Sequence, residues 1–180
     1  RLSNIQLGKN FEINDFKELE FKTFNKNIKN NDFLVKKSKN ITILGKVFDA
    51  QPLLKTLYKN NDKNKLSKNF TSQIKINFDK TITGTNDDIK DFGMIAFINK
   101  GSFDKLSLKG NFSEKEIVEM SIYKINNNQK TLHIISDRAR PFIKNFEFIK
   151  GFEGGKLEFE SNIFKGVSNS NLSITDFKVS

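Results

Sequence analysis

The single histidine of the chain, His133, is the first residue to consider for catalysis or metal binding. It stands between Leu132 and Ile134 in an alternating run, so its side chain should point to the opposite, solvent-facing side of a strand. No cysteine or acidic cluster is close to it in sequence to orient the imidazole. The chain has no cysteine at all, which excludes disulfides, thiolate catalysis and zinc sites built from sulfur. We therefore predict neither a catalytic nor a metal-binding role for His133.

Two other short segments have the composition of functional motifs without their spacing. Asp87, Asp88 and Asp91 form the nearest thing to a carboxylate cluster, but they lack the alternate spacing and the glycine of a calcium loop. We expect them in a loop that connects two strands. Residues 151–156 are rich in glycine, yet a strand is expected to follow them where a phosphate loop needs a helix. The sequence thus predicts a protein that is not an enzyme and uses no metal or cofactor.

The elements that carry these residues are expected to be strands, because most of the chain alternates apolar and polar residues with period two. The clearest case runs from Phe70 to Ile82, where the apolar residues share one parity. Clusters of Gly, Asn and Ser at 109–111, 126–128, 153–155 and 168–171 predict turns between antiparallel strands. These features predict a mainly β fold, a curved antiparallel meander of short strands.

Two short helices are expected among the strands, because one pattern occurs twice. Residues 49–57 align without a gap on residues 138–146, and each copy follows an alternating apolar run. Apolar residues in both copies fall on one face at helical spacing. We therefore predict short helices near residues 50–58 and 138–149.

The beginning of each predicted helix contains one of the two prolines of the chain, Pro52 and Pro141. Proline fits the first turn of a helix, because the N–H that it lacks would have no intrahelical partner there. Asp49 or Asp137 can cap the exposed donors just ahead.

The repeated pattern also predicts the organisation of the chain. We expect two repeat-like units, at about 1–58 and 70–150, with a polar loop at 59–68 between them. The chain begins with Arg1 rather than methionine, which favours a single segment of a longer repetitive protein. No apolar run is long enough to cross a bilayer.

The net charge of +10 has two interpretations. A basic surface attracts phosphate, on nucleic acid or on lipid headgroups. Alternatively, the excess of lysine reflects coding sequence rich in A and T, and the spread of lysines along the whole chain favours this second reading. Nucleic acid is not an expected partner, because base stacking needs exposed aromatic residues and these phenylalanines lie on the apolar parity.

The alternation leaves one apolar face of the sheet that two short helices cannot cover. Two arrangements would remove this apolar face from water. The sheet either folds on itself as a closed sandwich or barrel, or it stays open and curved around an apolar groove that another molecule fills. Periodicity alone does not choose between them.

A longer signature extends the second copy of the pattern: Leu132–Ala139, then Pro141–Phe146, then Ile149–Phe159. This strand, short helix, Gly-Gly turn and strand resembles the repeated C-terminal region of the AsmA-like family of bacterial envelope proteins, the group that includes TamB and YhdP. Ile43–Leu54 is similar to a preceding repeat of the same region. The resemblance covers most of the chain from about Ile41 to Phe159.

The resemblance implies a bridge-like lipid transport protein with a taco-shaped, open β-groove. Such a protein is anchored in the inner membrane by a part outside this segment and spans the periplasm. This segment would be a non-enzymatic conduit that carries phospholipid acyl chains between the inner and outer membranes for outer-membrane biogenesis. The expected partners are phospholipid and envelope proteins of either membrane.

In that interpretation, apolar residues of the alternating strands line a lipid-binding groove. The alternative is a closed β-sandwich, a structural or adaptor domain that binds a protein partner through an edge strand and buries the same residues in its own core. The candidate groove residues are Phe70, Ile74, Ile76, Phe78, Leu106, Leu108, Met120, Ile122, Leu132, Ile134, Leu157, Phe159, Leu172 and Ile174.

Overall fold

The computed structural model describes residues 2–3, 6–7, 13–57, 67–143 and 152–179. Within these ranges the chain is mainly β with two short helices, as the alternation and the repeated pattern predict. The strands are β1 (Leu2–Ser3), β2 (Gln6–Leu7), β3 (Ile13–Asp15), β4 (Glu18–Asn25), β5 (Ile28–Lys37), β6 (Ile41–Asp49), β7 (Ser72–Ile82), β8 (Ile89–Asn99), β9 (Ser102–Asn111), β10 (Ile117–Asn126), β11 (Gln129–Ser136), β12 (Phe152–Phe164) and β13 (Val167–Val179), and the helices are α1 (Gln51–Leu57) and α2 (Arg140–Ile143).

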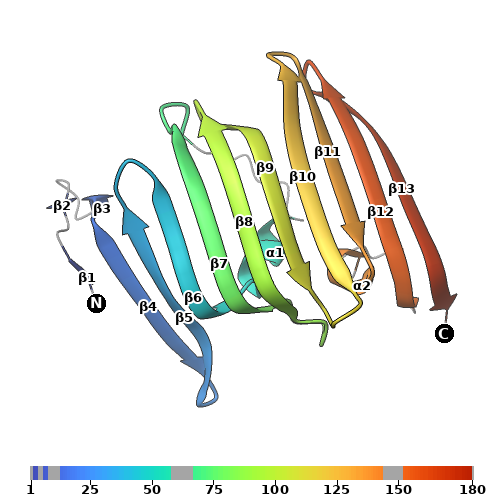
Figure 1. Cartoon of the computed structure of the whole chain (residues 1–180), viewed down its shortest axis with the longest axis horizontal. Helices are drawn as coiled ribbons and strands as arrows, with labels where there is room; N and C mark the ends of the chain where they lie inside the picture. Colours follow the sequence, from blue (N-terminus) through green and yellow to red (C-terminus); the bar gives the residue numbers. More distant parts are fainter. Residues whose placement is uncertain (1, 4–5, 8–12, 58–66, 144–151, 180) are drawn as a thin grey trace.

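Eleven of the strands form one open sheet in the order β1-β4-β5-β6-β7-β8-β9-β10-β11-β12-β13, while β2 and β3 pair separately. The two edges of the sheet lie at opposite ends of the molecule, and both helices lie behind the same face (Figure 1). The sheet is not closed into a barrel. The closed sandwich is therefore not the architecture of this chain, and the open meander is.

One pair of neighbouring strands departs from the predicted antiparallel order. β6 and β7 are parallel, with Ile41 beside Ile74 and Gly45 beside Phe78. Parallel strands cannot be joined by a tight hairpin, so the connection must return the chain to the end of the sheet where β6 began. The segment that contains α1 makes this return.

The two copies of the repeated pattern make matching hydrogen bonds. Ala50 N–H donates to Ile82 O (2.9 Å), and the aligned Ala139 N–H donates to Gly155 O (2.8 Å). Each alanine carbonyl then accepts the N–H of the residue four positions on, at 2.9 and 3.2 Å. Beyond the helices the copies differ, because α1 leads to a parallel neighbour and α2 leads to an antiparallel one.

The predicted helix starts are confirmed, and one of the two predicted caps is wrong. Asp49 Oδ1 accepts the N–H of Gln51 at 3.1 Å and so caps α1. Asp137 instead exchanges two hydrogen bonds with Ile117, from its own N–H to the carbonyl and from the Ile117 N–H to Oδ2 (both 2.9 Å), because β10 lies beside it. Residues 144–149 of the second helix and residues 59–66 of the predicted loop lie outside the described residues.

Several predicted turns lie inside strands. Only Asn126–Asn128 joins two strands as expected, β10 and β11, whereas 109–111, 153–155 and 168–171 belong to β9, β12 and β13. The turn between β12 and β13 is Lys165-Gly166, whose left-handed φ angles of 49° and 82° suit a two-residue hairpin. Composition misled here because each polar segment finds a ladder of partners on the neighbouring strand, as residues 168–171 do on residues 160–163.

The acidic cluster is also only partly a loop. Asp87 and Asp88 connect β7 and β8 as predicted, but Asp91 lies within β8. The register of β8 against β9 shifts at this point, and Asp91 has a left-handed φ of 50°, so a bulge accommodates it.

Candidate functional site

An unbroken row of apolar side chains crosses the sheet from β4 to β13. Each member lies directly opposite the next across its strand pair, so one residue from each of ten neighbouring strands stands on the face that carries the helices. We call it the apolar row. Its members are Leu19, Val35, Ile43, Ile76, Met94, Leu108, Met120, Ile134, Phe159 and Leu172.

A second row on the same face is shorter. It runs from Ile41 on β6 to Leu132 on β11 and ends in Ser161 and Ser170 on β12 and β13. The apolar character therefore extends over two rows in the centre of the sheet and narrows toward the β13 edge. The apolar members between these ends are Ile74, Ala96, Leu106 and Ile122.

The apolar row is long enough to accommodate a fatty-acyl chain that lies across the strands. Neighbouring strands lie about 4.8 Å apart, so ten strands span roughly 43 Å. Half of a bilayer's hydrocarbon core, which is the depth that one layer of acyl chains fills, is about 15 Å. A chain lying across the strands is shorter than the row and would contact apolar side chains along its length.

The predicted groove residues fall into four groups. Six of them belong to the apolar row, namely Leu172 and five others. Three half-buried residues, Ile74, Ile122 and Leu132, belong to the second row. Phe78, Leu106 and Leu157 are buried at 3–5% exposure and so belong to the core of the protein, not to an accessible surface. The five that share the apolar row with Leu172 are Ile76, Leu108, Met120, Ile134 and Phe159.

Phe70 and Ile174 lie at the margins of this face. Phe70 precedes β7, is half-buried, and accepts the N–H of Gly101 at its carbonyl (2.8 Å). Ile174 packs against the buried cluster of Ala139, Ile143 and Leu157 at α2.

Helix α2 covers part of the apolar face near the β13 edge. Ala139 and Ile143 are buried against Leu157, and Ile134 and Phe159 of neighbouring strands pack on the same cluster. An apolar face left uncovered over its whole width is therefore not what the chain forms. In the centre of the sheet, Ile76, Met94, Leu108 and Met120 stay only half-buried.

Phenylalanines of β4–β8 pack against one another and form part of the core of the protein. Phe78 stacks on Phe48 at a ring-centroid distance of 4.9 Å and on Phe92 at 6.1 Å, and it meets Phe33 edge-on at 5.8 Å. Phe33 in turn stacks on Phe21 at 4.9 Å. Such pairs contribute beyond their buried area, so they hold the central strands in register.

Charged groups bound the apolar face at the end of the sheet where β10 ends. Lys124 Nζ lies 3.1 Å from Asp104 Oδ1, and Lys130, directly opposite Lys124, contacts Ser102. Burial raises the pKa of the Asp104 carboxyl, but hydrogen bonds from Lys124 and Asn99 outweigh it, so the pKa is lowered overall. The apolar rows therefore end here in an ionised rim.

Arg138 bounds the opposite end of the face. Its Nη1 lies 2.7 Å from Asp87 Oδ1, its Nη2 lies 2.6 Å from Glu116 Oε2, and its guanidinium stands over the ring of Phe112. The hydrogen bond from Arg138 lowers the pKa of Glu116, and one from Ser113 adds to the effect. A polar hollow of about 400 Å³ lies beside this network, lined by side chains of both charges.

We predict that Arg138→Met destabilises the fold mainly above the pKa of Glu116. The native pKa of this carboxyl lies below its ordinary value of 4.5, so its pairing stabilises the protein above that pH and the stabilisation is lost as the pH falls. Because the side chains of Arg138, Asp87 and Glu116 are all partly solvated, the variant's free energy of unfolding at neutral pH should be lower by about 1 kcal/mol. Urea unfolding measured from pH 7 down through the acid range follows it, and a loss that does not shrink as the pH falls would contradict the ion-pair explanation.

His133 lies on the polar face, as predicted. Its Nε2 is 3.3 Å from Glu158 Oε1 on β12, and its side chain stands opposite Ser121 on β10. Among the residues that the structure describes, no group of three or more His, Cys, Asp and Glu side chains is arranged to hold a metal ion. Within the same residues, neither helix has the length and apolarity to cross a membrane.

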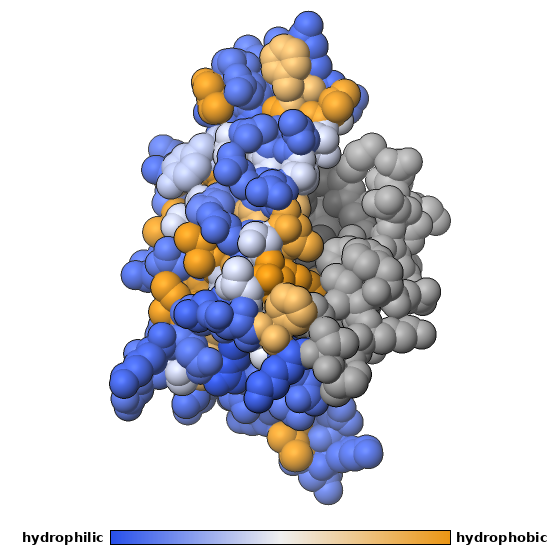
Figure 2. Space-filling model, turned by 90° about the vertical axis from the view of Figure 1, so that its right-hand side faces the viewer, coloured by the Kyte–Doolittle hydropathy of each residue, from blue (hydrophilic) through white to orange (hydrophobic). Residues whose placement is uncertain are grey.

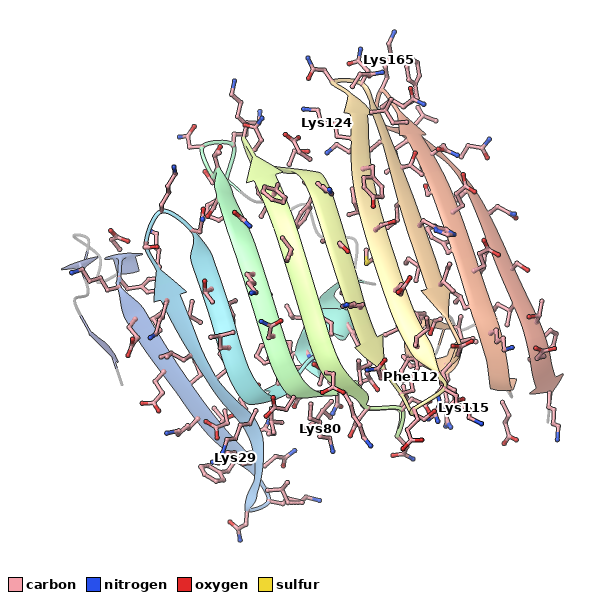
Figure 3. The ribbon with its side chains drawn as sticks, viewed as in Figure 1. Lys29, Lys80, Phe112, Lys115, Lys124 and Lys165 are labelled. Atoms are coloured by element: carbon pink, nitrogen blue, oxygen red, sulfur yellow. The ribbon has the colours of Figure 1, made fainter. Side chains whose placement is uncertain are left out.

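The lysines do not gather into one basic patch. Lys124 and Lys165 lie at one end of the strands, while Lys29, Lys80 and Lys115 lie at the other (Figure 3). Carboxylates pair with several of them, including Asp32 with Lys29 and Asp88 with Lys80, both at 2.9 Å. This distribution favours solvated lysines over a phosphate-binding surface.

Four members of the apolar row were missed by the sequence reasoning. Leu19, Val35 and Ile43 lie on β4–β6, and Met94 lies on β8. Alternation was present for Ile43, but residues 94–98 of β8 are apolar without interruption, so no parity marks the face. Only the register of the sheet brings these four into line.

Comparison with known proteins finds no family model, no curated protein and no solved structure that matches this chain. The resemblance to the AsmA-like repeated region therefore stays a prediction that rests on the residues alone.

Proposed function

We propose that this chain is a non-enzymatic lipid-binding segment whose apolar face holds phospholipid acyl chains and passes them along an open β-groove. The observation that carries the proposal is the apolar row, which is unbroken over ten strands of an open sheet. Leu19 is buried and Ile134 and Phe159 pack against α2, but the central members Ile76, Met94, Leu108 and Met120 stay half-buried. Apolar side chains that are left partly open on a surface mark a binding site for an apolar partner.

The energetics favour an acyl chain as that partner. Each methylene that leaves water contributes about 0.8 kcal/mol, and this driving force has no direction. A chain can therefore shift along the row without breaking specific contacts, because the central members carry no charged or hydrogen-bonding side chain. Methionines at Met94 and Met120 add side chains that adapt to irregular neighbours.

The polar ends of the strands set the orientation that we propose for the lipid. The ionised rim of Asp104, Lys124 and Lys130 and the Arg138 network lie at opposite ends of the strands, so the apolar strip between them runs across the strands. Acyl chains would lie in this strip, and headgroups would stay at its margins. The resemblance to AsmA-like proteins adds the proposed setting, the periplasm between the inner and outer membranes.

The test replaces one residue at the centre of the apolar row. Ile76→Asp puts a carboxylate among apolar neighbours, where an acyl chain would have to desolvate it. We expect the variant to lose at least tenfold in affinity for a fluorescent phospholipid, and native mass spectrometry should find phospholipid bound to the wild type but not to this variant. Asn77→Asp is the matched control, because it adds the same charge one position away on the exposed, opposite face.

Folding is measured on the same samples by circular dichroism and thermal unfolding. Ile76 is half-buried, so Ile76→Thr serves as a milder variant that keeps the β-branched shape while adding a hydroxyl. A lipid-free wild type that also refuses added phospholipid would overturn the proposal. So would equal binding by Ile76→Asp and Asn77→Asp.

A further inference from the structure

Two neighbouring hairpin tips at one end of the sheet carry strongly exposed apolar side chains. The tips are residues 125–128, where β10 turns into β11, and residues 164–167, where β12 turns into β13. Ile125 is 60% exposed, and Phe164 and Val167, which face each other in the second tip, are 54% and 74% exposed. Lys165 N–H donates to the carbonyl of Asn128 at 2.8 Å, so the two tips form one surface.

The exposure of these tips is a property of the hairpins themselves. Ile125 and Phe164 lie on β10 and β12, which already have neighbours on both sides, so a strand that pairs with either edge of the sheet does not cover them. The register of β10 against β11 shifts between Lys124 and Asn126, so the side chain of Ile125 has no directly opposed partner on β11. Both tips lie at the top of the sheet in Figure 1, and Figure 2 shows hydrophobic residues among hydrophilic ones at that end.

A row of side chains on the polar face leads to these tips. It crosses the sheet from Gln73 on β7 to Asn169 on β13 and includes Phe97, Lys105 and Tyr123. We call it the tip row. Phe97 and Tyr123 are 43% and 49% exposed, and Lys105 Nζ lies 5.8 Å from the centre of the Tyr123 ring. The tip row lies on the face opposite the apolar row, so this apolar surface is separate from the proposed groove.

This end of the polar face has lysines without carboxylates. Among the described residues, the tip row and the turns at 100–101, 127–128 and 165–166 contain no Asp or Glu. Asp104 lies at the same end of β9, but it shares the parity of Leu106 and so faces the helix-bearing side, where Lys124 pairs with it. The lysines of the tip row and these turns are Lys100, Lys105 and Lys165.

The opposite end of the sheet has a different charge pattern. Its turns at 83–88 and 112–116 contain the carboxylates Asp87, Asp88, Glu114 and Glu116. A negatively charged surface would be repelled by these groups, whereas it would approach the two tips without meeting a carboxylate.

We propose that the two tips dock on the surface of an anionic lipid bilayer. Ile125, Phe164 and Val167 would enter the boundary between headgroups and acyl chains, and Lys105 and Lys165 would lie beside lipid phosphates. The inference goes beyond the proposed function and does not depend on it, because docking uses the polar face and the tips, not the apolar row.

The chemistry of the tips favours a bilayer as the partner. Exposed apolar side chains gain free energy when they enter the interface, and lysines keep their ammonium groups at the phosphates while their stems lie along apolar surface. Tyr123 lies where an aromatic side chain would meet the headgroup layer. Over the whole chain the lysines are scattered, so the apolar tips rather than charge alone select this end. A nucleic acid backbone would match the lysines but would leave the apolar side chains in water.

Vesicle flotation tests the docking surface. We expect the wild type to float with vesicles made of equal parts of phosphatidylcholine and phosphatidylglycerol, and the double variant Ile125→Asp, Phe164→Asp to lose at least tenfold in affinity, because two carboxylates would then meet anionic headgroups. The four residues changed in this variant and its control are largely exposed, so both variants should fold, which circular dichroism verifies.

The matched control is the double variant Phe24→Asp, Ile28→Asp. These residues are 63% and 71% exposed at the β4–β5 tip, which lies at the opposite end of the sheet, and the change in charge is the same. Carboxylates already pair with lysines beside that tip, as Asp32 does with Lys29. We expect this control to float like the wild type.

A tryptophan reporter tests insertion directly, because the wild-type chain contains no tryptophan. The emission of Phe164→Trp should shift to shorter wavelength when these vesicles are added, and brominated lipid should quench it. Phe24→Trp, at the opposite end, should show neither effect.

The lysines are tested one at a time. Lys105→Gln and Lys165→Gln should each lower the affinity for the anionic vesicles about fivefold, since each lysine near such a surface contributes a comparable amount. Lys115→Gln is the control, because Lys115 lies at the other end of the strands from Lys165 (Figure 3). Its affinity should equal that of the wild type.

Four results would overturn the proposal. They are a wild type that does not float with the anionic vesicles, equal losses in the two double variants, unchanged emission of Phe164→Trp on vesicles, and binding of duplex DNA in place of vesicles. The groove proposal is tested separately. Ile76→Asp should float like the wild type because Ile76 lies on the other face, and the tip double variant should still bind monomeric fluorescent phospholipid.

Discussion

Phe78→Ala is expected to lower the free energy of unfolding by about 3–5 kcal/mol, because it removes the central ring of the phenylalanine cluster. Phe78 is 3% exposed and meets the rings of Phe33, Phe48 and Phe92, which come from three different strands. Truncation leaves a cavity that none of these rings fills by a small movement, because each is fixed by its own strand. Urea denaturation followed by circular dichroism measures the change.

The control for this prediction is Phe97→Ala. Phe97 has the same side chain on the neighbouring strand β8 but is 43% exposed, so its truncation should cost less than about 1 kcal/mol. Similar losses for the two variants would show that the phenylalanine cluster is not the stabilising core described above. A Phe78→Leu variant should lose an intermediate amount, since it keeps most of the buried volume.

Gly45→Ala is the second change with a large expected effect, a loss of about 2–3 kcal/mol. A Cβ atom at Gly45 would lie 2.4 Å from the carbonyl oxygen of Asp32 and 2.7 Å from the Cα of Phe33, so backbone would have to move. The register of β5 against β6 shifts between these two residues, and the missing side chain of Gly45 makes room for this bulge. The same denaturation experiment measures the loss.

Gly93→Ala is the matched control on β8. A Cβ there meets only Asn77 Oδ1 at 3.4 Å, and the residue does not have a left-handed φ. Alanine is preferred to glycine in the interior of a strand, so the change should be neutral or slightly stabilising. A large loss at Gly93, or no loss at Gly45, would contradict the steric argument.

The strands and helix starts could be predicted from the sequence because their signals are local. Alternation marks β7, β9, β10 and β11, and a proline one residue into each helix marks α1 and α2. The cap by Asp49 follows from the same local pattern. The missed cap at Asp137 shows the limit, because its partner Ile117 lies 20 residues earlier in the chain, at the far end of the β10–β11 hairpin.

The candidate site could be predicted only in part, because it depends on register. Parity correctly assigns Ile76, Met120 and Phe159 to one face, but parity cannot show which residues of different strands lie opposite one another. The order of the strands decides this, and the parallel pairing of β6 with β7 was not foreseen. It places β4–β6 beside the strands that carry the predicted groove residues and adds three residues to the apolar row.

The serine- and asparagine-rich segment 168–171 was misread for a related reason. These residue types favour turns when nothing else satisfies their backbone. Here β12 supplies a partner for each position, and Ser170 Oγ also donates to Ser161 Oγ at 2.8 Å. The tight turn falls instead at Lys165-Gly166, where two consecutive left-handed residues are needed.

The two helix-containing connections have a consequence for how the molecule opens. The sheet consists of three groups of strands, β4–β6, β7–β11 and β12–β13, within which each strand follows its neighbour directly, so the contacts inside a group are local in sequence. The β6–β7 and β11–β12 ladders, which join these groups, pair strands that are separated by longer connections. Local hairpins form and re-form faster than ladders that must first close a long excursion. Native-state hydrogen exchange should consequently resolve three cooperative units, with the amides of the β6–β7 seam exchanging before those inside either flanking group.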